Sequence, residues 1–142
     1  MGTLIQADSD ARELVTEILE ETTWWSTLRV LVEFLDAKHV VKVRAEFGYI
    51  LDRDLAGNQQ GSDEIVKLDD LERFIKAGLA EGKIEWNRSS DFRFYPLGTE
   101  LAFMLCNDAD LHFASADSAL LAEFAQTLRA NGVRVYDSVS PA

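Results

Sequence analysis

Residues Leu101–Phe113 read LAFMLC, NDAD and LHF, which are two apolar runs on either side of a polar segment. Six consecutive apolar residues bounded by polar ones are typical of a strand that is covered on both faces. Asn and Asp bond their own main chain and tolerate the left-handed region, so Asn107–Asp110 predicts a turn. The stretch therefore predicts a β-hairpin. Its expected cross-strand pairs are Leu105 with Leu111 and Phe103 with Phe113.

The second face of this hairpin is where catalytic residue types meet. Its expected members are Ala102, Met104, Cys106, Asp110 and His112. A thiol becomes a nucleophile near neutral pH only beside a base, so Cys106, Asp110 and His112 form a candidate catalytic set. The competing interpretation, which we favour, is that Cys106 is a small buried apolar residue and His112 a half-exposed strand residue. No catalytic residue is therefore assigned.

Length and composition indicate one α+β domain over residues 1–142. The chain is 47% hydrophobic and 27% charged with two prolines, so disorder is not expected. Its net charge of −11 disfavours nucleic acid and anionic membrane surfaces as partners, and it favours a basic protein. The charge alone leaves binding proteins and acidic enzymes both open.

The cysteine content and the N-terminal residues predict a cytoplasmic location. A single cysteine permits no disulfide within the chain, which is typical of a reducing compartment. The first residues have neither a basic start nor an apolar core, so no secretory signal is expected. No apolar run approaches the ~20 residues that span a bilayer.

Hydrophobic periodicity predicts the first half of the fold. Helical spacing of apolar residues predicts a helix over Asp10–Thr22, with Asp10 and Glu13 as a capping box. Alternation then predicts a hairpin of residues 28–35 with residues 40–47. The expected charged pairs across it are Glu33 with Lys42 and Arg29 with Glu46.

The second half predicts further strands and two more helices. A short strand at Ile65–Leu68 precedes a helix that begins at Asp69 and ends at Gly82. Residues 84–86 and 92–94 predict a hairpin that continues as a meander into residues 101–113. A helix capped by Asp117 and a final strand, Val133–Tyr136, follow. The predicted class is α+β: a largely antiparallel sheet of hairpins and a meander, with about three helices packed on it.

Two features suggest a surface for a protein partner. Trp24 and Trp25 are adjacent, and in the expected extended segment one of them would face solvent. The alternative, which we favour, is that both cover the end of the sheet beneath the first helix. Acidic residues are concentrated in residues 8–21 and 52–72, with a long Gly- and Asp-rich loop in the second group. The candidate partner-binding residues are Trp24, Trp25, Asp52, Asp54, Asp63 and Glu64.

Three functions remain open on these patterns. The leading hypothesis is an acidic, non-enzymatic module that binds a basic protein, as an inhibitor, an immunity-type antidote or a chaperone would; a homodimer is also open. The second is a small enzyme with a thiol or acid–base site at Cys106, Asp110 and His112. The third is a small-ligand pocket lined by Trp86, Phe92 and Tyr95. Asp108 and Asp110 are better explained as turn residues than as cation ligands, so no metal or cofactor is expected.

Overall fold

The structure, a computed structural model, describes residues 12–50, 62–81, 90–105 and 110–137, and the side chains of 47–50, 62–63 and 90–91 are outside that description. In chain order, its strands and helices are β1 (Arg12–Thr16), α1 (Glu21–Ala37), β2 (Lys42–Ile50), β3 (Ser62–Lys67), a 3-10 turn (Leu68–Asp70), α3 (Leu71–Glu81), β4 (Ser90–Pro96), β5 (Leu101–Leu105), β6 (Leu111–Ser115), α4 (Ser118–Ala130) and β7 (Val135–Asp137).

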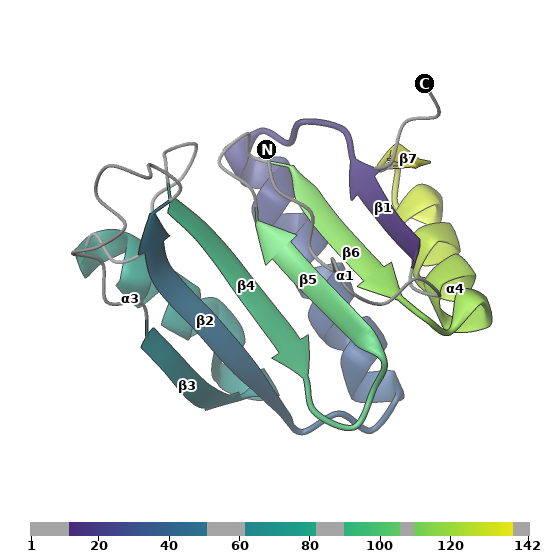
Figure 1. The fold of residues 1–142 in the computed structure, drawn as a ribbon. Coiled ribbons are helices and arrows are strands. Elements are labelled where there is room, and N and C mark those ends of the chain that lie inside the picture. The colour runs from purple at the N-terminus through teal and green to yellow at the C-terminus, as the bar shows by residue number, and fades with distance from the viewer. Residues whose placement is uncertain (1–11, 51–61, 82–89, 106–109, 138–142) are drawn as a thin grey trace.

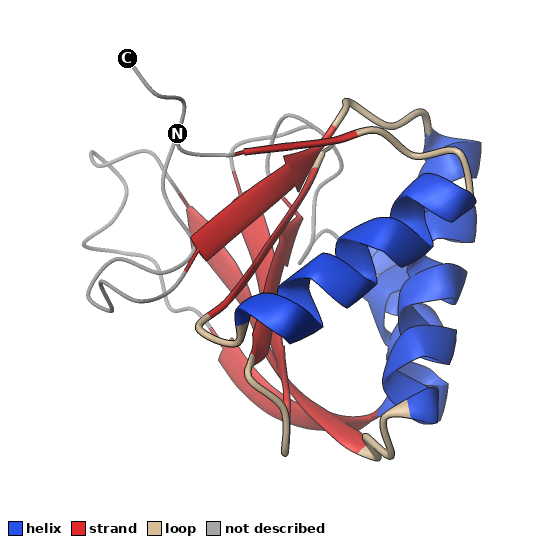
Figure 2. Ribbon diagram, turned by 90° about the vertical axis from the view of Figure 1, so that its right-hand side faces the viewer, coloured by secondary structure: helices blue, strands red, loops and turns tan. Residues whose placement is uncertain are grey.

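The strands form one seven-stranded sheet in the order β3-β2-β4-β5-β6-β1-β7 (Figure 1), and every neighbouring pair is antiparallel. The three helices α1, α3 and α4 cover one face of it, which Figure 2 shows edge-on. The expected α+β class, with an antiparallel sheet and three helices on it, is confirmed. Figure 1 looks onto the opposite face, which carries none of the described helices and is called the helix-free face below.

The two strands predicted within Leu101–Phe113 are confirmed with their register, while residues 107–109 of the predicted turn lie outside the described residues. Leu105 lies opposite Leu111 and Phe103 opposite Phe113. All ten residues of β5 and β6 are buried, as expected for apolar strands at the centre of a sheet. The Phe113 ring packs edge-on against the Phe124 ring of α4, with their centroids 4.8 Å apart. This hairpin therefore lies at the centre of the hydrophobic core.

The predicted helix over Asp10–Thr22 is wrong: Arg12–Thr16 is strand β1, which lies between β6 and β7. The helical spacing treated Glu13 as a solvent-facing residue and as part of a capping box. Glu13 is 6% exposed and lies opposite Ala114 of β6, so pairing on both edges of β1 outweighs the weak helical pattern.

The predicted hairpin of residues 28–35 with 40–47 is also wrong in its first strand. Residues Glu21–Ala37 are helix α1, and only the second strand, now β2, is confirmed. The buried positions repeat every three or four residues, which is the spacing of one helical face. They are Trp24, Thr27, Leu28, Leu31, Phe34 and Leu35. The helix ends where His39 takes φ of 67° and the Val40 N–H donates to the Leu35 carbonyl at 3.0 Å.

The charged pairs expected from that hairpin are consequently absent. Glu46 lies opposite Asp63 of β3 and Arg93 of β4, while Arg29 points from α1 to Glu72 of α3. Of the predicted hairpin of 84–86 with 92–94, the first segment lies outside the described residues. Both edges of 92–94 are occupied by β2 and β5, so this pairing is not available to them.

The remaining elements agree with the sequence. Helix α3, helix α4 and strands β3 and β7 fall at the predicted places. The Asp117 side chain caps α4 by accepting the Leu120 N–H at 3.1 Å. Gly132 takes φ of 85° just after α4, where a glycine avoids the strain of a side chain.

Candidate functional site

Polar side chains follow one another across the helix-free face of the sheet, from β2 to β1. The register places them on alternate residues of neighbouring strands, because successive side chains point to opposite faces. The members are Arg44 and Glu46 on β2, Arg93 and Tyr95 on β4, His112 on β6 and Glu13 on β1. Between them, Ala102, Met104 and Ala114 form a small apolar cluster with Tyr95.

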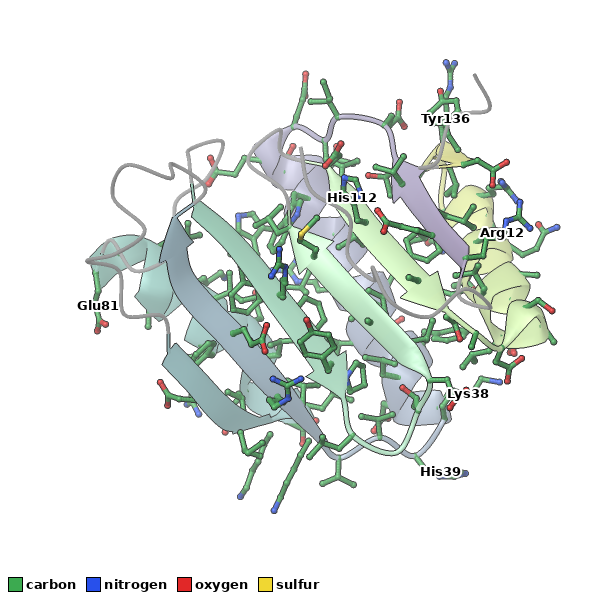
Figure 3. The ribbon with its side chains drawn as sticks, viewed as in Figure 1. Arg12, Lys38, His39, Glu81, His112 and Tyr136 are labelled. Atoms are coloured by element: carbon green, nitrogen blue, oxygen red, sulfur yellow. The ribbon has the colours of Figure 1, made fainter. Side chains whose placement is uncertain are left out.

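His112, which Figure 3 labels on the helix-free face, is the centre of a buried acid–histidine cluster formed with Glu13 and Asp110. Its Nδ1 lies 2.7 Å from Oε2 of Glu13, and its Nε2 lies 3.2 Å from Oδ1 of Asp110. His112, Glu13 and Asp110 are 1%, 6% and 8% exposed. Neighbouring strands supply Glu13 and His112, and Asp110 immediately precedes β6.

The geometry of the cluster limits its chemistry. Each nitrogen of the imidazole faces a buried carboxyl oxygen, as a polar side chain in a protein interior requires a polar partner. A general base needs a ring nitrogen that can reach a substrate proton. Both nitrogens of His112 lie against carboxylate oxygens, and the ring is almost fully covered. The cluster is therefore arranged to hold β1, β6 and the segment before β6 together.

A second polar group lies near the other end of the row. The Arg44 guanidinium contacts Glu46 and lies over the Tyr95 ring, 4.3 Å from its centroid. The Tyr95 hydroxyl donates to Glu46 Oε1 at 3.3 Å. Partial burial, reinforced by the negative charge of Glu46, raises the pKa of the Tyr95 phenol above its usual value. Tyr95 is therefore a neutral hydrogen-bond donor at physiological pH.

The enzyme hypothesis stays a prediction, whereas the expectation of a half-exposed His112 is wrong, because this residue is buried. Asp110 and His112 are adjacent as predicted, whereas Cys106 and Asp108 lie outside the described residues. Glu13 was missed because an acidic residue in an amphipathic pattern is normally assigned to solvent. The β-branched pair Val15 and Thr16 is the only local signal that favours a strand over a helix there.

The three residues proposed to line a ligand pocket do not share one face. Phe92 points into the helix-covered core, while Tyr95 lies on the helix-free face, and Trp86 is outside the described residues. Within the described ranges, no three His, Cys, Asp or Glu side chains are grouped to hold a metal ion.

The candidate partner-binding tryptophans lie on helix α1 and differ in exposure. Trp24 is 2% exposed in the core, and Trp25 is half-buried. The two rings meet edge-on at 4.9 Å, and the Lys76 ammonium lies 5.2 Å from the Trp25 ring centroid. Trp24 therefore offers almost no surface to a partner, and Trp25 offers only part of its ring.

Two of the four candidate partner-binding acids fall on β3. Asp63 and the exposed Glu64 belong to β3, whereas Asp52 and Asp54 lie outside the described residues. The acids that follow β3 are largely neutralised. Asp70 pairs with Arg73, and Glu72 pairs with both Arg29 and Lys76.

A more open group of acids lies at the turn from β1 to α1, within residues 17–21. We call Glu17, Ile18, Glu20 and Glu21 the acidic corner. Glu17 accepts the main-chain N–H of Arg134, and no Lys or Arg side chain of the described residues forms an ion pair with its three carboxylates. Ile18 is 73% exposed between them. The sequence indicated the charge here but not the exposed isoleucine.

Two hollows that are lined by described residues lie away from His112. One of about 370 Å³ lies between β1, β7 and α4, with Arg12, Arg129 and Tyr136 in its wall. Another, of about 510 Å³, lies between β3 and α3. Neither contains the titratable groups of the acid–histidine cluster.

Comparison of the chain with protein-family models, with curated proteins and with solved structures found no match. Among the described helices, none has the length and apolar character needed to cross a membrane.

Proposed function

We propose that this protein is a non-enzymatic module that binds a basic protein partner through the acidic corner. The observation that carries the proposal is the exposure of Ile18 among three carboxylates that form no ion pair with a described basic side chain. An exposed apolar side chain supplies contact energy, and the surrounding charge selects and steers a partner of opposite sign.

The distribution of ion pairs supports this choice of surface. Six basic side chains of the described residues are already engaged by acids of the same chain. They are Arg12, Arg29, Lys38, Arg44, Arg73 and Lys76. The excess negative charge of the chain is therefore left at places such as the acidic corner, where a basic partner would be attracted over about 8–10 Å at physiological salt.

The acid–base alternative has less support. Catalysis at His112 would require a ring nitrogen open to substrate, and both lie against carboxylates in a covered cluster. A cytoplasmic inhibitor, an immunity-type antidote or a chaperone would all use an acidic surface of this kind. These remain forms of the same proposal.

The test separates local charge from net charge. The corner variant is Glu17→Gln/Glu20→Gln/Glu21→Gln. The control variant is Glu33→Gln/Asp69→Asn/Glu100→Gln, which removes the same charge from exposed acids elsewhere. A partner retained from extract of the native host is identified by mass spectrometry and purified, and its association rate is measured at low and physiological salt. We expect the rate to fall about tenfold with salt. The corner variant should lose that dependence, while the control keeps most of it.

Two results would contradict the proposal: a partner whose association rate is the same with the corner variant, or two variants with equal effects. A third variant, Asp52→Asn/Asp54→Asn/Asp63→Asn/Glu64→Gln, tests the acids first predicted from the sequence. If it alone slows association, the surface is at β3 and the preceding loop. Ile18→Ser should accelerate dissociation, because it removes the exposed apolar contact.

A further inference from the structure

Strand β3 is at one end of the sheet, and its outer edge pairs with no other described strand. The direction of its main-chain groups follows from two hydrogen bonds. Leu97 N–H donates to Lys42 O on the β4 side, and Leu68 N–H donates to Val41 O on the β3 side. Because this direction alternates along an antiparallel strand, Val43 and Ala45 of β2 bond Val66 and Glu64 of β3.

The main-chain N–H and C=O groups of residues 63, 65 and 67 therefore point away from the sheet, toward the outer edge. The same three positions share the helix-free face, since they lie opposite Glu46, Arg44 and Lys42 of β2. They are Asp63, Ile65 and Lys67. Ile65 is 56% exposed, which is unusual on an edge that proteins generally protect from pairing.

The register of β3 against β2 brings residues of like charge opposite each other at both ends of β3. Asp63 lies opposite Glu46, and Lys67 lies opposite Lys42, so both ends of β3 bring like charges together across the strands. Like charges directly opposite each other are destabilising. Lys42 and Lys67 form no ion pair with any described residue. Each end of β3 would gain from an opposite charge on its other side.

We propose that β3 pairs with β3 of a second copy of this chain, antiparallel, about a two-fold axis at Ile65. In this register Ile65 faces Ile65 of the second copy, and Asp63 takes the position opposite Lys67 of the second copy at both ends. The outward main-chain groups of all three positions then face one another as hydrogen-bonded pairs. One sheet runs continuously through both copies, and the contact is self-complementary as two-fold symmetry requires.

Neighbouring registers with the same symmetry fit less well. An axis at Glu64 places two glutamates opposite each other and Ile65 opposite Asp63. An axis at Val66 places Ile65 opposite Lys67. Only the axis at Ile65 joins apolar with apolar and acid with base. The alternating sequence Asp63, Ile65 and Lys67 is thus complementary to its own reverse, which is why we choose a second copy over an unrelated strand as the occupant.

A hollow borders the β3 edge on the side of α3. The hollow of about 510 Å³ between β3 and α3 is lined by the β3 edge together with Asp70, Arg73, Phe74 and Ala77. Arg73 and Ala77 are exposed on the side of α3 that would approach α3 of the second copy. The surface is separate from the acidic corner, so this proposal does not depend on the function proposed above.

The test uses charge reversal at the two ends of β3. Sedimentation velocity of the wild-type chain over a range of concentrations should show a reversible dimer. Lys67→Asp or Asp63→Lys alone should raise the dimer dissociation constant about tenfold or more, because two symmetry-related pairs become like-charged. An equimolar mixture of the two variants should form a heterodimer, since every position across the axis is again acid with base. The double variant should recover the wild-type dissociation constant.

Ile65→Pro is a second, independent variant. It removes an N–H that points to the outer edge and takes no part in the bonds to β2, so the monomer should fold normally while the dimer is lost. Val66→Pro is the control, because it removes a bond to β2 and should destabilise the monomer. A wild-type chain that stays monomeric at high concentration overturns the proposal. So does a dimer unaffected by Lys67→Asp, or a mixture of single variants that forms no heterodimer.

Discussion

Two glutamates each join separate elements of this fold through close contacts with basic groups, and they differ chiefly in burial. Glu13 lies 2.7 Å from His112 and is 6% exposed, between β1 and β6. Glu72 lies 3.1 Å from Arg29 and 2.8 Å from Lys76, between α1 and α3, with 27% of its side chain exposed. Contacts of similar length between a glutamate and a basic group therefore occur both in a buried cluster and at the solvent-exposed surface.

Burial decides how much stability is lost when such a contact is broken. At the surface, water replaces the lost partner, and most of the interaction energy is recovered. In the interior, the remaining charge has no substitute, and removing one partner commonly costs several kcal/mol. We therefore expect the Glu13 cluster to control stability and the Glu72 contacts to adjust it slightly.

The largest effect is expected from His112→Leu. This substitution leaves the carboxylates of Glu13 and Asp110 buried without the imidazole between them, and the cost should be about 3–5 kcal/mol of unfolding free energy. Urea denaturation followed by circular dichroism measures it. His39→Asn is the control, because His39 is exposed and asparagine tolerates its positive φ.

The control variant should stay within about 0.5 kcal/mol of the wild-type protein. If His112→Leu were equally mild, the acid–histidine cluster would not be a structural unit. The enzyme hypothesis would then regain support, because a buried titratable group with no role in stability is a candidate for chemistry.

A smaller effect, with a defined pH dependence, is expected from Glu72→Gln. Hydrogen bonds from Arg29 and then Lys76 lower the pKa of Glu72 to about 2 from its ordinary 4.5. A lowered pKa stabilises the folded state above the unfolded value, and that stabilisation disappears as pH falls from about 5 toward 2. Because Glu72 is partly solvated, we expect about 1 kcal/mol or less at pH 7.

The measurement compares wild-type and Glu72→Gln unfolding free energies at pH 7 and near pH 2.5. The difference should be clear at pH 7 and small at the lower pH. A difference that is independent of pH would mean that Glu72 acts through packing rather than through its charge.

The contrast between Glu13 and Glu72 also explains what the sequence could predict. The hairpin of β5 and β6 was predictable because its apolar residues and its turn residues agree on one register. Helix α1 was assigned to a strand because Leu28, Val30, Val32 and Phe34 alternate, although the fully buried Leu31 and Leu35 follow helical spacing. β1 was assigned to a helix because its apolar residues follow helical spacing. The partner of its buried Glu13 is His112, 99 residues away, and local periodicity carries no information about such a partner.

The smallest effect distinguishes the two assignments of residues 28–35 directly. If these residues formed a strand opposite β2, Glu33 and Lys42 would be paired, and neutralising both would show coupling. In the structure Glu33 is exposed on α1, and the acid contacted from this helix is Glu72, through Arg29. A double-mutant cycle with Arg29→Gln and Glu72→Gln should therefore show favourable coupling that weakens as salt is added. Lys76→Gln serves as the background, so that only one cation contacts Glu72. The matched cycle with Glu33→Gln and Lys42→Gln should show none. Coupling in the second cycle and none in the first would restore the hairpin and remove α1 from the fold, because each pair can form in only one of the two arrangements.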